Sequence, residues 1–306
     1  MTKRNLTLGT ASGKLGSVVY FRRRGQQIAR VLVSQVNDKK TIGQCFQRAK
    51  FANYVSAWRL VKQYVGSTWL NASRYGTAEN AFYHHNRALM PCISKEMSRL
   101  GYGWPPLGII TYGSLPSYIS AVYGKATRVG QSVGVNMSYL PYGRASAAPS
   151  TIAEFSSVIV GAGYGLEYGD ILHILYWSVP IASFEEPISA GEEVSPKLLH
   201  ASINLNAADD TLLFDAAPWW NVRLVSPENG GYALELDLVS AYDPADPTDG
   251  FSYPFFAVWV ERPSNKSHAR FSRGRIVGVT DAYNLLKALT EDTLPARSMA
   301  LSYMLV

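Results

Sequence analysis

The sequence predicts an α+β protein of two domains, a basic β-hairpin with helices over residues 1–100 and an antiparallel β-sandwich over residues 107–306. The first observation is a change of hydrophobic period. Apolar residues recur every three or four positions before residue 100, whereas short alternating runs dominate after residue 106. The second is the segment Gly-Tyr-Gly-Trp-Pro-Pro at 101–106, whose glycines and prolines are typical of a boundary. A chain of 306 residues is also long enough to bury two cores.

Two β-prone runs lie near the start of the chain, at residues 16–24 and 26–33. They flank Gly25, a residue that adopts the left-handed conformation of a tight turn at little cost. The sequence therefore predicts a β-hairpin whose tip carries three consecutive arginines, Arg22 to Arg24.

Helices follow the hairpin. Thr41 is expected to cap a long helix, with Gln44 reaching back to the same turn. Spacings of three and four define one buried stripe on this helix, formed by Phe51, Tyr54, Trp58, Val61 and Val65. A second helix is predicted over Ala78–Arg99, with Thr77 as its cap and Pro91 as a kink or a break.

The C-terminal part reads as β-structure with one late helix, Asp281–Leu289. Helical segments do not alternate with the strands, so an antiparallel sandwich is favoured over a parallel sheet. The predicted strands are Leu107–Tyr112, Ser132–Leu140, Ser156–Val160, Ile171–Val179, Leu198–Leu205, Thr211–Phe214, Trp220–Val225, Tyr232–Val239, Phe255–Val260 and Arg275–Val279.

The net charge of +6 is distributed very unevenly along the chain. Residues 1–62 hold thirteen lysines and arginines against one acid, Asp38, whereas residues 101–306 hold twelve bases and twenty acids. Such asymmetry indicates a polyanionic partner at the basic end, with a solvated basic surface as the alternative. The candidate contact residues are Arg22, Arg23, Arg24, Arg30, Lys39, Lys40, Arg48, Arg59 and Lys62.

Two local patterns support this interpretation. A two-stranded ribbon with a cationic tip can follow a phosphate backbone, and the ribbon's Tyr20 and Phe21 are suited to stacking on bases. On the long helix, Arg48, Arg59 and Lys62 fall within about 60° of one another, along one edge of the buried stripe.

Patterns that carry metal or cofactor chemistry are weak. His84 and His85 are adjacent, so on a helix they point about 100° apart and cannot share one ion. The glycines of 161–165 lack the spacing and the following helix of a dinucleotide-binding turn. The two cysteines, Cys45 and Cys92, make no disulfide framework and are expected to be free thiols or small core residues. We therefore expect no metal, no cofactor and no enzymatic activity.

The residues Gly13–Gly25 with Arg30, and then Thr41, Gln44, 47–51 and 57–58, carry a resemblance. Together they are similar to the start of an uncharacterised domain family of gut-type bacteria and their phages. Members open with a Gly-x-x-Gly-x-Val-Val hairpin, an Arg-rich turn and a Thr-x-x-Gln-x-x-x-Arg-x-x-Phe helix before a β-rich region. The family's Asn-Pro-x-Thr-Pro approach to the helix is Asp-Lys-Lys-Thr-Ile here. The resemblance implies a virion component and no known activity.

These observations predict a phage virion structural or assembly protein, assembled in the host cytoplasm as a homo-oligomer, whose basic N-terminal domain contacts nucleic acid or an acidic capsid partner. One alternative is a free cytoplasmic nucleic-acid-binding protein. Another is a carbohydrate-active enzyme that uses the loop acids Glu185, Glu186, Glu192 and Glu193. No membrane partner is expected, because the apolar stretches are shorter than the roughly 20 residues that a spanning helix needs.

Overall fold

The computed structural model describes residues 3–5, 10–23, 26–33, 39–70, 76–115, 125–129, 132–136, 149–161, 165–180, 197–216, 220–225, 233–238, 252–263, 269–278 and 280–304. The chain divides into two compact units, a first unit of Met1–Thr41 and a second unit of Ile42–Val306. The α+β class is confirmed, since helices and antiparallel sheets are both present.

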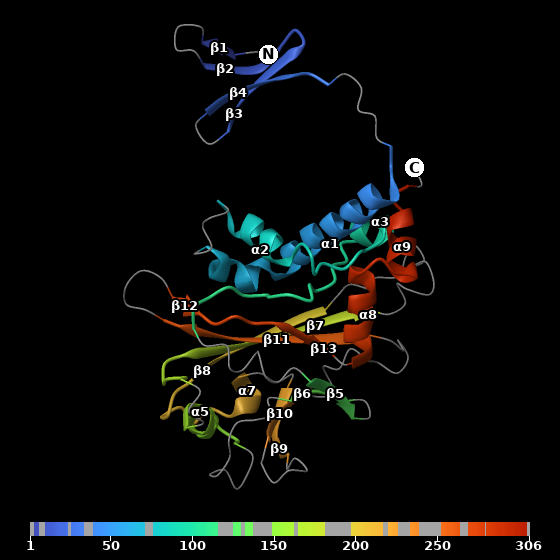
Figure 1. The fold of residues 1–306 in the computed structure, drawn as a ribbon. Coiled ribbons are helices and arrows are strands. Elements are labelled where there is room, and N and C mark those ends of the chain that lie inside the picture. Colours follow the sequence, from blue (N-terminus) through green and yellow to red (C-terminus); the bar gives the residue numbers. More distant parts are fainter. Residues whose placement is uncertain are drawn as a thin grey trace. The chain divides into compact units, whose positions relative to one another are not determined.

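The first unit is a four-stranded antiparallel sheet in which each strand pairs with the next along the chain (Figure 1). The predicted hairpin corresponds to its last two strands. The first two strands were not predicted, because residues 10–15 contain a glycine and few β-branched side chains. The four strands are β1 (Lys3–Asn5), β2 (Thr10–Leu15), β3 (Val18–Arg23) and β4 (Gln26–Val31).

The second unit begins with helix α1 (Ile42–Val65), which confirms the long helix predicted from Thr41. The short helix η1 (Gly66–Trp69) follows it. The helix predicted over 78–99 is present as two, α2 (Ala78–Asn86) and α3 (Lys95–Arg99). Thr77 accepts a hydrogen bond from the backbone N–H of Asn80, as the capping prediction required. The helix breaks before Pro91, because proline cannot donate to the preceding turn.

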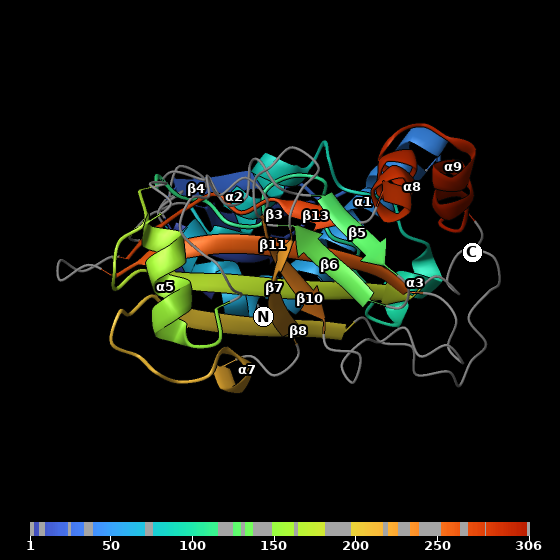
Figure 2. The same ribbon diagram turned by 90° about the horizontal axis from the view of Figure 1, so that it is seen from below.

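The second unit also contains two antiparallel sheets. The larger one has five strands in the order β12, β11, β7 and β8, with β13 also pairing with β11. Figure 2 shows β11, β7 and β8 side by side. Its strands are β7 (Ile171–Pro180), β8 (Lys197–Asn204), β11 (Ser252–Arg262), β12 (Arg270–Phe271) and β13 (Ile276–Gly278). The smaller sheet consists of β5 (Lys125–Val129), β6 (Ser132–Asn136), β10 (Ala233–Leu238) and β9 (Trp220–Val225).

Two predicted strands of the C-terminal part are helical. Residues 156–160 belong to α5 (Ile152–Gly161), and residues 213–214 to the short α7 (Leu213–Ala216). Helix α5 begins with reciprocal capping bonds that override its β-branched composition: Glu154 N–H donates to Thr151 Oγ1, and the Glu154 carboxylate accepts from the Ser150 N–H. The predicted strand 107–112 contributes only an isolated bridge between Ile109 and Arg275.

The predicted late helix is present as α8 (Thr280–Thr290), and an unpredicted α9 (Leu294–Leu301) follows it. Helix α1 lies on one face of the larger sheet, and α5 lies on the opposite side (Figures 1 and 2). Of the predicted stripe on α1, four side chains are buried, but Phe51 is 52% exposed and packs edge-on against the ring of Tyr83.

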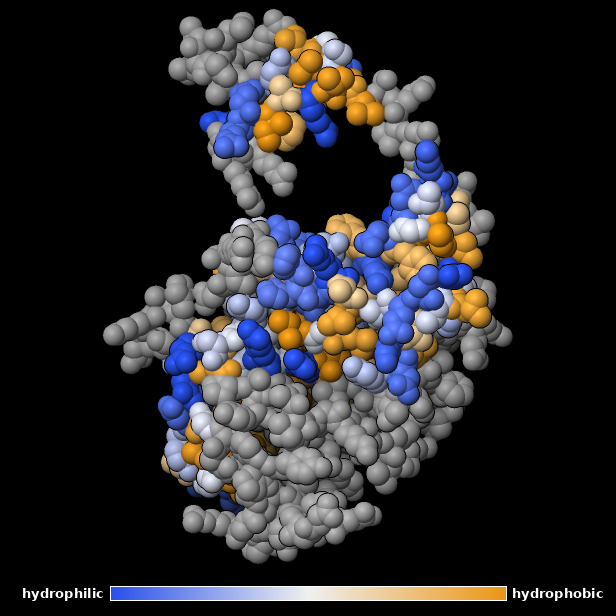
Figure 3. Space-filling model, viewed as in Figure 1, coloured by the Kyte–Doolittle hydropathy of each residue, from blue (hydrophilic) through white to orange (hydrophobic). Residues whose placement is uncertain are grey.

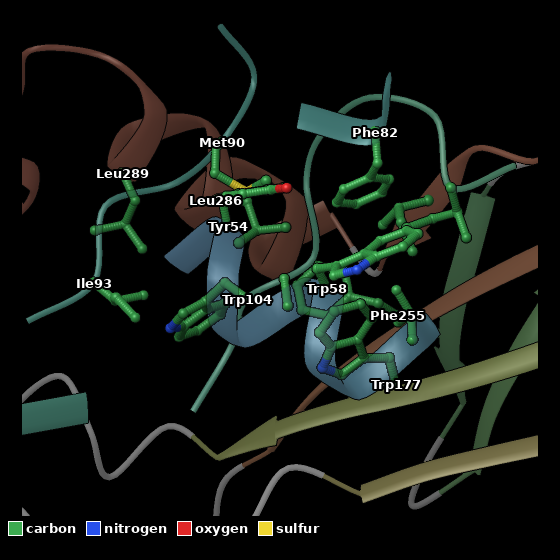
Figure 4. Packing of buried hydrophobic residues seen from close by; sticks show 14 of the residues in the cluster. Tyr54, Trp58, Phe82, Met90, Ile93, Trp104, Trp177, Phe255, Leu286 and Leu289 are labelled. Carbon is green, nitrogen blue, oxygen red and sulfur yellow. The ribbon is translucent and has the colours of Figure 1, made fainter. Parts of the chain in front are cut away.

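One hydrophobic core joins the helices of residues 42–100 to the larger sheet, so the division lies before α1 and not at residues 101–106. Figure 4 shows Trp58 of α1, Trp104, and Trp177 and Phe255 of the sheet within this core. The glycine at 103 serves close packing: a Cβ there would lie 2.6 Å from the backbone nitrogen of Ala57 in α1. The Gly/Pro-rich segment is therefore a buried part of the core and not a linker.

Candidate functional site

The sheet of the first unit presents cations beside aromatic side chains. Val19 pairs with Lys14 on one neighbouring strand and with Arg30 on the other, so these three residues share one face of the sheet. Phe21 lies two residues along the same face, and the Arg30 guanidinium carbon lies 5.6 Å from its ring centroid. Lys14 and Arg30 are exposed. This face thus combines positive charge with a partly accessible aromatic ring.

The register divides the predicted hairpin cations between two faces. Arg30 pairs with Val19, whereas Arg22 pairs with Gln27. Val19 and Arg22 are three positions apart on β3, and side chains alternate along a strand, so Arg22 lies on the face opposite Arg30. Arg23 pairs with Gln26 at the end of the hairpin, and Arg24 lies outside the described residues. The hairpin cations therefore do not form one patch.

Two further candidates lie at the end of the first unit. Lys39 is exposed and Lys40 is half-buried. Lys40 has a φ of 44°, in the left-handed region that non-glycine residues rarely adopt. The chain therefore turns sharply just before α1 begins at Ile42.

Helix α1 carries the remaining candidates. Its 24 residues include four bases and no acid. Arg48, Arg59 and Lys62 are all exposed, and with 1.5 Å of rise per residue they extend over about 21 Å of one helix edge. The fourth base, Lys50, points elsewhere and donates to the Thr290 carbonyl of α8 at 2.8 Å. Figure 3 shows hydrophilic residues interspersed with hydrophobic ones over the upper part of the second unit.

Three arginines outside the candidate set pair with carboxylates of this chain. The guanidinium of Arg262 donates two hydrogen bonds of 2.7 Å to the buried carboxylate of Asp170 and a third to Glu167. The bonds to Asp170 raise the pKa of Arg262. On the surface, Arg99 pairs with Glu96 and Arg297 with Asp292. These bases tie this chain to its own carboxylates, and we assign them structural roles.

A histidine pair that sequence reasoning did not find lies on the sheet beneath α1. His173 of β7 and His200 of β8 are 3.2 Å apart through Nδ1 and Nε2, and His173 Nε2 lies 3.1 Å from a carboxylate oxygen of Glu261. An ionised carboxylate only accepts, so the Nε2–H of His173 donates to it and the Nε2–H of His200 donates to His173 Nδ1. The chain of two hydrogen bonds therefore fixes both tautomers.

Burial sets the protonation of this group. Desolvation lowers the pKa of His173 to about 4, and desolvation together with the charge of His173 lowers that of His200 to about 4. Burial also raises the pKa of Glu261. The ring of Trp259 stacks on His173 with centroids 5.1 Å apart, and Tyr64 of α1 lies 4.8 Å from His200. At neutral pH the group is thus a neutral histidine pair held by one carboxylate.

A second cluster missed by sequence reasoning lies on the surface of the second unit, and we call it the aromatic–arginine cluster. Its rings and its guanidinium come from four separate segments of the chain, so no local sequence pattern predicts the cluster. The guanidinium carbon of Arg273 lies 5.5 Å from the centroid of Tyr112, and Tyr112 is 5.1 Å from His85. The cluster consists of Trp69, His84, His85, Tyr112 and Arg273.

Other candidate chemistry has little geometric support. Among the described residues, no group of three or more possible ligands lies close enough to hold a metal ion. Cys45 and Cys92 are buried thiols that form no disulfide, and burial raises the pKa of Cys92 to about 11. The four acids of residues 185–193 lie outside the described residues. Within the described part of the chain, no helix is both long and apolar enough to cross a membrane.

No family model, no curated protein and no solved structure matches this chain.

Proposed function

We propose that this chain is a structural or assembly protein of a phage virion, whose basic N-terminal part contacts nucleic acid or an acidic capsid partner. The observation that carries the proposal is the acid-free α1, which places Arg48, Arg59 and Lys62 along one exposed edge. An ordinary solvated face mixes both signs of charge, whereas a row of cations attracts a polyanion over a distance.

The first unit supports the same proposal. Met1–Thr41 carries nine lysines and arginines against the single acid Asp38. Its sheet places Lys14 and Arg30 on one face together with Phe21. Cations beside an aromatic ring suit a partner that has both phosphates and bases. The same charges also suit an acidic protein surface, so duplex DNA and polyglutamate both serve as probes of the contact.

Assembly is the role that we propose for the β-rich part. The two antiparallel sheets of the second unit would pack as the faces of a sandwich, an architecture common in virion building blocks. A homo-oligomer would also multiply weak contacts through avidity. Light scattering after size exclusion separates this role from a free cytoplasmic binder: a defined oligomer supports the virion role, and a stable monomer contradicts it.

Salt-dependent binding to duplex DNA and to polyglutamate tests the polyanion contact. A partner held through about six phosphates loses about a thousandfold in affinity between about 50 and 200 mM salt. The double variant Arg59→Glu, Lys62→Glu should reduce the slope of log affinity against log salt by about 2, since each lost contact removes about 0.9.

The matched control reverses two exposed lysines elsewhere, Lys95→Glu and Lys287→Glu, and changes the net charge by the same amount. It should leave the slope unchanged. Equal losses in both double variants, or an affinity that stays flat across the salt range for both probes, would contradict a specific α1 contact.

A further inference from the structure

The aromatic–arginine cluster holds its arginine in a fixed position. Thr111 Oγ1 donates to the Ser272 carbonyl at 2.8 Å and accepts from the Gly274 N–H at 2.6 Å. These two bonds are made by the residues on either side of Arg273, and the threonine directly precedes Tyr112. The buried Thr111 therefore joins the backbone next to Tyr112 to the backbone on both sides of Arg273.

The tyrosine ring is itself supported from below. Trp69 is fully buried, donates from its indole N–H to the Ile110 carbonyl at 2.8 Å, and stacks on Tyr112 at 5.6 Å with 29° between the planes. The exposed Arg273 also lies over the Tyr112 ring, and the exposed His85 packs against it with the ring planes tilted by 39°. Tyr112 thus contacts both a buried tryptophan and an exposed guanidinium.

We propose that the aromatic–arginine cluster is a phosphate-binding site on the second unit, and that its ligand is a phosphodiester of single-stranded nucleic acid. This inference rests on the proposed function, and it narrows the polyanion to nucleic acid. The Arg273 guanidinium carbon lies 5.5 Å from the centroid of the Tyr112 ring, and the planar fork of guanidinium donors matches two phosphate oxygens.

Two features favour nucleic acid over an acidic peptide. The exposed imidazoles of His84 and His85 offer ring faces for bases beside the arginine, and an acidic peptide has no groups to stack there. The local field is also positive. After burial, the charges of His84 and Arg273 lower the pKa of His85, and the permanent charge of the Arg273 guanidinium would attract an anion placed beside these rings.

Binding of an unstructured thymidine 15-mer tests the site in the full chain. Arg273→Gln should weaken binding about tenfold and lower the salt slope by about 1, as expected for the loss of one charge-assisted phosphate contact. Arg273→Lys keeps the charge but loses the fork, so it should recover only part of the affinity. Histidine NMR titration should show the pKa of His85 rising when the oligonucleotide is bound, because a phosphate stabilises the charged imidazole.

Arg270→Gln is the matched control, since it removes the same charge from an exposed arginine three positions away. It should bind like the unmodified chain. If Arg273→Gln binds normally while Arg59→Glu, Lys62→Glu does not, the cluster is not a site and the α1 contact stands. If Arg273→Gln alone loses binding, the cluster stands and the α1 contact fails. Competition by polyglutamate as strong as that by the oligonucleotide would overturn nucleic acid as the ligand.

Discussion

His173 and His200 share a hydrogen bond of 3.2 Å between neighbouring strands, directly beneath α1. The other ring nitrogen of His173 is held by Glu261 at 3.1 Å, and Trp259 covers the ring. Both imidazoles are therefore stable in the fold as neutral groups. Protonating either one would place a charge in a desolvated site. Protonating His173 would also break the bond between them, since its Nδ1 is the acceptor and a doubly protonated ring has none.

The first prediction is a loss of stability in mild acid. The pKa of each histidine falls from 6.5 to about 4 on folding, so the unfolded chain binds more protons than the folded chain between those values. The stability is fully present above about pH 6.5 and is lost as the pH falls through 4. The raised pKa of Glu261 acts in the opposite direction, but it is one group against two. Urea unfolding at about pH 7.5, 5.5 and 4.5 measures the effect.

Replacing a histidine identifies the source of this pH dependence. His200→Gln should flatten the change in unfolding free energy across the window, because one of the two shifted groups is gone. His84→Gln removes an exposed histidine of α2 and should leave the change as it is. An equal flattening in the two variants would contradict the assignment to the buried pair.

Sequence reasoning worked where one local pattern decided the structure. Thr41 and the spacing of apolar residues were enough for α1, and alternation gave β9 with its bounds Trp220–Val225. It failed where a second pattern competed. The run 156–160 is β-branched, yet the capping bonds at Ser150 and Glu154 make it helical. The composition of a segment alone does not show whether helix capping or β-propensity decides its structure.

The histidine pair and the aromatic–arginine cluster could not be predicted from the sequence for a different reason. His173 and Glu261 are 88 positions apart, and Arg273 and Tyr112 are brought together only by the fold. The cationic edge of α1 was predictable because helical periodicity places its three members without tertiary information. The opposite placement of Arg22 and Arg30 required the strand register, which the turn alone did not supply.

The second prediction concerns Asn53, a fully buried residue of α1. Its side chain makes both backbone hydrogen bonds of Trp104, accepting from the N–H at 2.7 Å and donating to the carbonyl at 3.2 Å. Asn53→Ala leaves two buried backbone groups without a partner, so we expect a loss of about 3 kcal/mol in unfolding free energy. Gln63→Ala changes an exposed residue of the same helix and should be nearly neutral. Chemical denaturation measures both, and similar losses would contradict the role of the amide.

The third prediction concerns the pair of Arg262 and Asp170. Arg262→Ala leaves the buried carboxylate uncompensated, and we expect a loss of about 3 kcal/mol. Adding Asp170→Asn should restore part of this stability, since the uncompensated charge is then removed. A double-mutant cycle by urea unfolding gives the coupling between the two side chains. Additive losses would show that the two bonds of 2.7 Å do not stabilise the fold.

The fourth prediction uses two glycines with opposite surroundings. A Cβ at Gly113 would lie 1.8 Å from the carbonyl oxygen of Phe271, a backbone atom of β12 that cannot move away alone. Gly113→Ala should therefore lower the unfolding free energy by about 3 kcal/mol. Gly43 lies in the first turn of α1 with no atom within 4 Å of its Cβ position, so Gly43→Ala should stabilise the protein slightly.

Gly113→Ala and Gly43→Ala should also differ in their effect on the aromatic–arginine cluster. Gly113 follows Tyr112, and Phe271 is two residues before Arg273, so forcing these backbones apart should also separate the guanidinium from the ring. Gly113→Ala should then weaken oligonucleotide binding even under conditions where circular dichroism shows the chain folded, whereas Gly43→Ala should bind as before. A folded Gly113→Ala protein with normal binding would mean that the close approach of these two backbones does not position Arg273.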